Sequence, residues 1–122
     1  MAKVDMELKK AFTELQEKQI ETAQKLRIAD MQIENLKRNK QHASITEREI
    51  NALEEGTRTY ESVGRMFYLT PVEKVKENLG NKQKTAEEKI KVLESSKSYL
   101  ENSLQEATKN LRELVQTKKD RE

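Results

Sequence analysis

Few residues in this sequence could take part in catalysis. His42 is the only histidine and cysteine is absent, so a thiolate nucleophile or a cysteine–histidine metal site cannot be built. The adjacent carboxylates Glu54-Glu55 and Glu87-Glu88 could in principle act as acid and base, but a raised carboxyl pKa needs an apolar pocket that nothing near them supplies. We therefore expect no enzyme activity, no metal site and no cofactor.

Charged partners are also weakly supported. The chain carries 24 basic and 22 acidic residues, and the C-terminal cluster Lys118-Lys119-Arg121 is interleaved with Asp120 and Glu122. Glycine-rich phosphate loops are missing. No apolar run approaches the roughly 18 residues that a membrane span needs, and the charged first ten residues do not resemble a secretory signal. We expect a cytoplasmic protein that binds neither nucleic acid nor membranes.

The composition limits the elements that could position any site. Of 122 residues only 34% are hydrophobic and 38% are charged. That balance is too polar for a wide, self-contained core, and it is typical of long helices or coiled coils. The question is then which helical pattern the apolar residues follow.

Two long segments keep a heptad repeat. The first seam is Asp5, Leu8, Phe12, Leu15, Gln19, Thr22, Leu26, Ala29, Ile33, Leu36, Lys40 and Ala43. The second is Val72, Lys76, Leu79, Gln83, Ala86, Ile90, Leu93, Lys97, Leu100, Leu104, Ala107, Leu111, Leu114 and Lys118. Apolar residues dominate both, which predicts an antiparallel coiled-coil hairpin more than ordinary amphipathic helices on a core. The polar seam residues cost stability but can fix the register.

We expect a mainly α fold in one domain, 1–122, with a small β-hairpin at the end where the helices connect. The first helix is predicted over 1–43, a connector over 44–70, the second helix over 71–118 and a tail over 119–122. Thr70, Pro71 and Glu73 form a typical helix start, with a capping box and proline at the first helical position. Gly80 is a weak point in the second helix.

The connector has two parts. Residues 46–53 suggest a short helix that Gly56 would end, whereas 57–69 hold most of the aromatic residues and favour a β-hairpin with its turn at 62–64. Met66 and Tyr68 would lie on one face of its second strand, and Phe67 and Leu69 on the other. Such a strand needs cover on both sides, which predicts assembly with other subunits. The alternative is a hairpin that folds back on its own coiled coil.

Particular segments resemble the β-type subunits of prefoldin. They are 7–16, 86–90, 97–101 and, most distinctive, 60–67, which reads YESVGRMF. The resemblance implies a hexamer of two α-type and four β-type subunits that binds unfolded proteins, such as actin and tubulin, and passes them to the cytosolic chaperonin without ATP hydrolysis. It also implies that the residues for subunit assembly are Tyr60, Val63, Gly64, Arg65, Met66, Phe67, Tyr68 and Leu69.

The free helix ends are the second candidate site. One antiparallel register pairs Leu8 with Leu111 and Thr22 with Lys97, and it leaves apolar side chains poorly covered at the ends. The candidate client-binding residues are Val4, Met6, Leu8, Leu111, Leu114 and Val115. Two alternatives stay open: frayed helix ends without a function, and a structural coiled-coil adaptor in a multiprotein complex.

Overall fold

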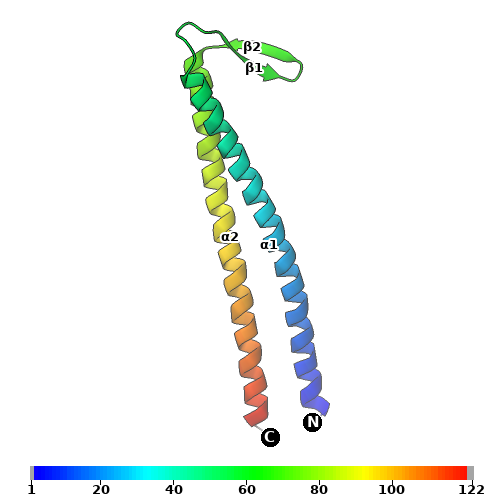
Figure 1. Ribbon diagram of the computed structural model, residues 1–122. Coiled ribbons are helices and arrows are strands. Elements are labelled where there is room, and N and C mark those ends of the chain that lie inside the picture. Colours follow the sequence, from blue (N-terminus) through cyan, green and yellow to red (C-terminus); the bar gives the residue numbers. More distant parts are fainter. Residues whose placement is uncertain (1, 121–122) are drawn as a thin grey trace. The chain divides into compact units, whose positions relative to one another are not determined.

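The computed structural model describes residues 2–120, with side chains from residue 6 onward. In chain order the elements are α1 (Ala2–Asn51), β1 (Thr59–Val63), β2 (Met66–Thr70) and α2 (Val72–Asp120). Two long helices with a small antiparallel sheet between them confirm the predicted fold class (Figure 1).

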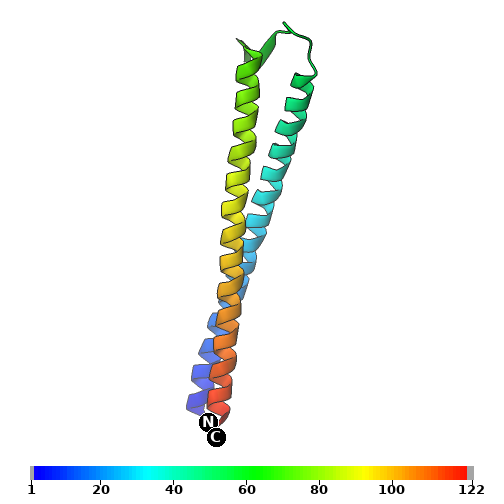
Figure 2. The ribbon, with the colours of Figure 1, turned by 90° about the vertical axis from the view of Figure 1, so that its left-hand side faces the viewer.

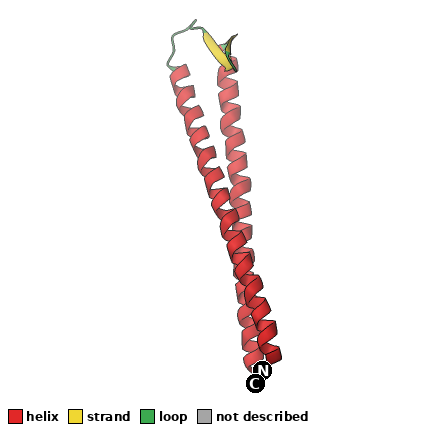
Figure 3. Ribbon diagram, turned by 90° about the vertical axis from the view of Figure 1, so that its right-hand side faces the viewer, coloured by secondary structure: helices red, strands yellow, loops and turns green. Residues whose placement is uncertain are grey.

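The chain divides into two compact units, and both helices run through both of them. The terminal unit comprises Met1–Met31 and Leu93–Glu122, and the hairpin unit comprises residues 32–92. Within the terminal unit, the first turns of α1 and the last turns of α2 lie side by side, as two perpendicular views agree (Figures 1 and 2). Within the hairpin unit, the two strands lie between the end of α1 and the start of α2, and an irregular loop joins α1 to β1 (Figure 3).

The first helix is longer than expected. It continues to Asn51, so the predicted end at residue 43 and the separate short helix over 46–53 are wrong. Thr46 does not cap a new helix, because its hydroxyl donates to the His42 carbonyl one turn earlier, at 2.9 Å, which a threonine inside a helix commonly does. Gly56 lies in the loop at φ +86°, five residues beyond the end of the helix.

The second helix begins one residue later than expected. Its first hydrogen bonds go to the Pro71 carbonyl, from the amides of Lys74 at 3.0 Å and Val75 at 3.1 Å. Thr70 belongs to β2, and its hydroxyl donates to the Tyr68 carbonyl at 3.2 Å. The predicted capping role of Thr70 is therefore not what the structure shows, because the carbonyl of Pro71, one residue later, accepts the first bonds of the helix.

The helix seam of the terminal unit departs from the strict heptad. Phe12 is 51% exposed and Gln19 is exposed, while Ala11 and Lys18 take the inward positions. After Leu15 the inward residues are therefore Lys18, Thr22 and Leu26, and the distance from Leu15 to Leu26 is a step of eleven residues. Because a straight α-helix has 3.6 residues per turn, such a step keeps the seam in place with less supercoiling. Thr22, at the centre of the step, is buried.

The core is a single thin row in each unit. Its buried apolar residues are Ala29 and Leu111 in the terminal unit, and Ile33, Ala43, Val75, Ala86 and Ile90 in the hairpin unit. Val75 takes the inward position that the heptad assigned to Lys76, which is exposed. Small alanines at three of these sites bring the helices close but bury little apolar area.

Cross-helix contacts in the terminal unit set a register about two helical turns away from the predicted one. Lys97 pairs with Asp30 and Lys118 with Glu7, whereas the predicted register placed Lys97 opposite Thr22. Leu111 lines a small cavity with Ala11 and Leu15. The predicted pairings of Thr22 with Lys97 and of Leu8 with Leu111 are therefore wrong, because the ion pairs across the helices and the cavity around Leu111 bring later residues of α1 opposite α2.

The Asp30–Lys97 pair provides a test of this register. The hydrogen bond from Lys97 to Asp30 raises the pKa of the lysine, against a smaller opposing effect of desolvation. We expect Asp30→Asn to lower the Lys97 pKa, measured by NMR titration of its Cε and Hε resonances. A raised folded-state pKa stabilises the helix pair at all pH values below the unfolded pKa, and that contribution disappears as pH rises through the folded pKa. An unchanged Lys97 pKa in the variant would contradict the register.

Candidate functional site

The hairpin brings all eight predicted assembly residues into one small element. β1 and β2 pair antiparallel, with Thr59 opposite Thr70 and Val63 opposite Met66. Two residues, Gly64 and Arg65, connect the strands, so the turn lies later than the predicted 62–64. Gly64 has φ +62° and Arg65 does not have positive φ, a combination typical of a type II′ turn, in which glycine takes the first central position.

The two faces of this ribbon have different surroundings. Alternate residues share a face, so Tyr60, Phe67 and Leu69 lie on one face and Glu61, Met66 and Tyr68 on the other. All the large apolar side chains of the hairpin are exposed within the chain, Phe67 most of all at 72%. The ribbon therefore has no apolar cover from residues 6–120 on either face of β2.

A polar contact fixes the hairpin to the second helix. The Asn78 side-chain amide of α2 donates to the Glu61 carboxylate of β1 at 2.8 Å, and both side chains are half-buried. The Thr59 hydroxyl donates to the Thr70 carbonyl at the open end of the ribbon. These contacts hold the base of the hairpin, whereas the apolar residues near the turn remain free to meet another surface. The sequence reading missed Asn78, because an asparagine on a polar helix has no distinguishing pattern.

The predicted client-binding residues are only partly exposed. Met6 is 74% exposed, while Leu8, Leu114 and Val115 are half-buried and Leu111 is buried at 8%. The Val4 side chain lies outside the described residues. Leu111 therefore belongs to the helix seam and not to a free surface.

Phe12 adds to this end of the terminal unit and was missed as a surface residue. The heptad spacing places it in the seam, but the inward positions follow the eleven-residue step, which leaves Phe12 exposed. Lys118 forms an ion pair with Glu7, which places a charged contact beside the exposed Met6. The helix ends thus carry a small apolar surface with a charged border.

Other chemistry finds no site in the part of the chain that the structure describes. Over that part no three histidine, cysteine or acidic side chains are grouped so that they could hold a metal ion. None of its helices combines the length and the apolar character that a membrane span requires.

The hairpin between two long helices matches known proteins over nearly the whole chain. The family model described as "Prefoldin subunit" matches residues 13–118. Human prefoldin subunit 1 is 55% identical over 118 residues, covering 97% of both chains, and the Arabidopsis thaliana protein of that name is 38% identical, covering 87% of this chain and 83% of its own. The crystal structure of the prefoldin beta subunit from Thermococcus strain KS-1 superimposes with a TM-score of 0.72 at 22% identity, covering 88% of this chain and 90% of that one. That structure shares the fold.

The turn type can be tested by replacing its glycine with alanine and comparing the effect with the same change at a glycine inside a helix. Gly64→Ala places a side chain at positive φ and should disfavour the hairpin by about 1 kcal/mol, or about five-fold in its population. Gly80→Ala is the matched control, because nothing lies within 4 Å of the added carbon and alanine favours a helix. Cα chemical shifts of residues 59–70 report the hairpin. Equal shifts in both variants would argue against the type II′ turn.

Proposed function

This chain belongs to the prefoldin subunit family, and we propose that it works as one subunit of a heterohexameric prefoldin co-chaperone. In this proposal the complex contains two α-type and four β-type subunits and resides in the cytosol. It binds unfolded polypeptides such as nascent actin and tubulin and transfers them to the cytosolic chaperonin. Transfer proceeds without ATP hydrolysis, and this chain contributes no catalysis.

The observation that carries the proposal is the uncovered hairpin. A two-stranded ribbon is marginally stable in water, and this one exposes large apolar side chains on both faces. Burying one such side chain contributes on the order of 1.5–3 kcal/mol, so association with other subunits supplies stability that the chain alone lacks. Tyr60, Val63, Met66, Phe67, Tyr68 and Leu69 are the contact residues in this proposal, with Gly64 and Arg65 forming the turn.

The helix ends are the proposed client-binding surface. Met6 is largely exposed to solvent, and Leu8, Leu114 and Val115 offer partial apolar area near it, with Val4 belonging to the same proposed surface. Methionine adapts its shape to varied partners, which suits a surface that binds many unfolded sequences weakly. Leu111 would act only by holding the helix seam, since it is buried.

Assembly through the hairpin predicts a specific effect of Phe67→Asp. A carboxylate at this position cannot be buried in an apolar interface without a large cost, so the variant should fail to join the complex. Tyr99→Asp is a matched control on α2, because Tyr99 is 73% exposed against 72% for Phe67. Native mass spectrometry after co-expression with the other subunits measures incorporation. Normal incorporation of Phe67→Asp would contradict the proposed interface.

Client binding at the helix ends predicts a second, separate effect. Replacing Met6, Leu114 and Val115 with serine should reduce the suppression of aggregation of a chemically denatured, unrelated protein several-fold, because apolar contact area is lost. The hexamer should persist, and native mass spectrometry checks this. Ile20→Ser and Met31→Ser serve as the control, since both side chains are exposed on α1 away from the helix ends. Unchanged capture by the helix-end variant would refute this site.

A further inference from the structure

A groove in the hairpin unit has an apolar floor and polar walls. It lies between α1 and α2, with a volume of about 690 Å³. Leu36, Ala43, Leu79 and Ala86 contribute its apolar lining. Ala43 and Ala86 are both buried and short, so the helices meet at the floor while space remains above it. The groove can therefore accept side chains from another molecule.

The lining of this groove carries positive charge without an acidic residue beside it. Lys82 and Lys89 line it, and no aspartate or glutamate does. Three other lysines do pair with a carboxylate of the facing helix, Lys40, Lys97 and Lys118. The contact of Lys40 with Glu87, at 2.6 Å, lowers the pKa of that acid. Lys82 and Lys89 take part in none of the ion pairs that residues 6–120 form. Two lysines beside an apolar floor attract a carboxylate-bearing partner.

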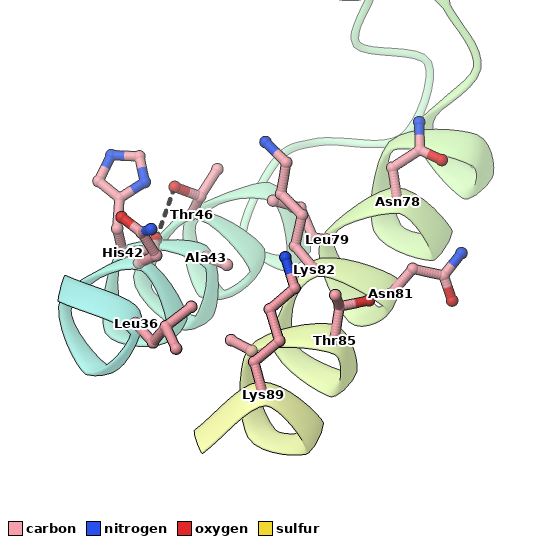
Figure 4. Close-up of a pocket in the computed structure, with 12 residues that line it drawn as sticks. Leu36, His42, Ala43, Thr46, Asn78, Leu79, Asn81, Lys82, Thr85 and Lys89 are labelled. Atoms are coloured by element: carbon pink, nitrogen blue, oxygen red, sulfur yellow. Dashed lines mark hydrogen bonds between the residues drawn. The ribbon is translucent and has the colours of Figure 1, made fainter. Parts of the chain in front are cut away.

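The spacing of the two lysines describes the shape of that partner. They are seven residues apart on α2, which is two helical turns or about 10 Å. In Figure 4 both side chains extend from α2, Lys82 above Lys89, with Leu36 and Ala43 on the facing helix α1. Polar residues of α1, His42 and Thr46, form the opposite wall. A third helix laid along a groove between two helices presents residues at this same two-turn interval.

We propose that this groove binds an acidic, amphipathic helical segment of a neighbouring subunit. Its apolar edge packs on Leu36 and Leu79, and two carboxylates about two turns apart pair with Lys82 and Lys89. The groove adjoins the hairpin, because Asn78 borders it and also donates to Glu61 of β1. A subunit that covers the hairpin is thereby within reach of the groove. The proposal rests on the proposed function, since it names a second contact within the same complex.

Photo-crosslinking in the assembled complex identifies the occupant. Thr85 borders the groove, so a benzophenone side chain introduced there in place of threonine should link to a different subunit. The linked peptide should be helical and carry two acidic residues about seven positions apart. Links confined to this same chain, to a peptide without carboxylates or to nucleic acid would overturn the proposal.

Charge neutralisation tests the role of the lysines. Lys82→Gln with Lys89→Gln should weaken the affinity of this chain for the other subunits about tenfold at 0.1 M salt and flatten its salt dependence. Lys84→Gln with Lys91→Gln is the matched control, because it removes the same charge at the same spacing from residues of α2 that do not line the groove. Equal affinities of the two double variants would overturn the groove proposal.

The experiments distinguish a failure of the proposed hairpin interface from a failure of the groove proposal alone. If Phe67→Asp incorporates normally, the hairpin interface and the groove that depends on it are both wrong. If Phe67→Asp fails to incorporate while the two lysine variants behave alike, only the groove proposal is wrong.

Discussion

An apolar ribbon that residues 6–120 leave largely exposed is the constraint on which the rest of this structure depends. Five large side chains of the hairpin are each more than half exposed to solvent: Tyr60, Met66, Phe67, Tyr68 and Leu69. An isolated two-stranded sheet gains too little from its few hydrogen bonds to offset its ordering. In the proposed complex, association supplies the stability that this element lacks, and the hydrogen bond from Asn78 to Glu61 ties its first strand to α2.

The helices carry a correspondingly thin core. One row of inward residues, several of them alanine, holds each helix pair together, and no larger side chain among residues 6–120 is completely buried. Because the seam buries so little apolar area, the exposed hydrophobic residues at the hairpin and the helix ends are the surfaces whose burial by a partner would release the most free energy. Polar contacts such as Lys97 with Asp30 and Gln83 with Glu47 contribute alignment more than stability. A chain with only 34% hydrophobic residues is consistent with this division.

Composition and periodicity predicted the fold well, because both signals are repeated over many residues. The two helices, the hairpin and the faces of its second strand followed from heptads, aromatic content and the alternation of side chains. Boundaries and register were harder to predict. Thr46 reads as a helix start but bonds back to His42 inside α1, and Phe12 reads as a seam residue but turns outward. A shift of about two turns costs little in a seam of small and polar residues, so the local pattern could not settle the register.

Hydrogen exchange of the hairpin amides tests the central claim most directly. If assembly supplies the missing cover, residues 59–70 should exchange rapidly in the isolated chain and become protected by several orders of magnitude in the reconstituted hexamer, while the seam of α2 is protected in both. Strong protection of residues 59–70 in the isolated, monomeric chain would show that the hairpin is stable by itself and would contradict the account.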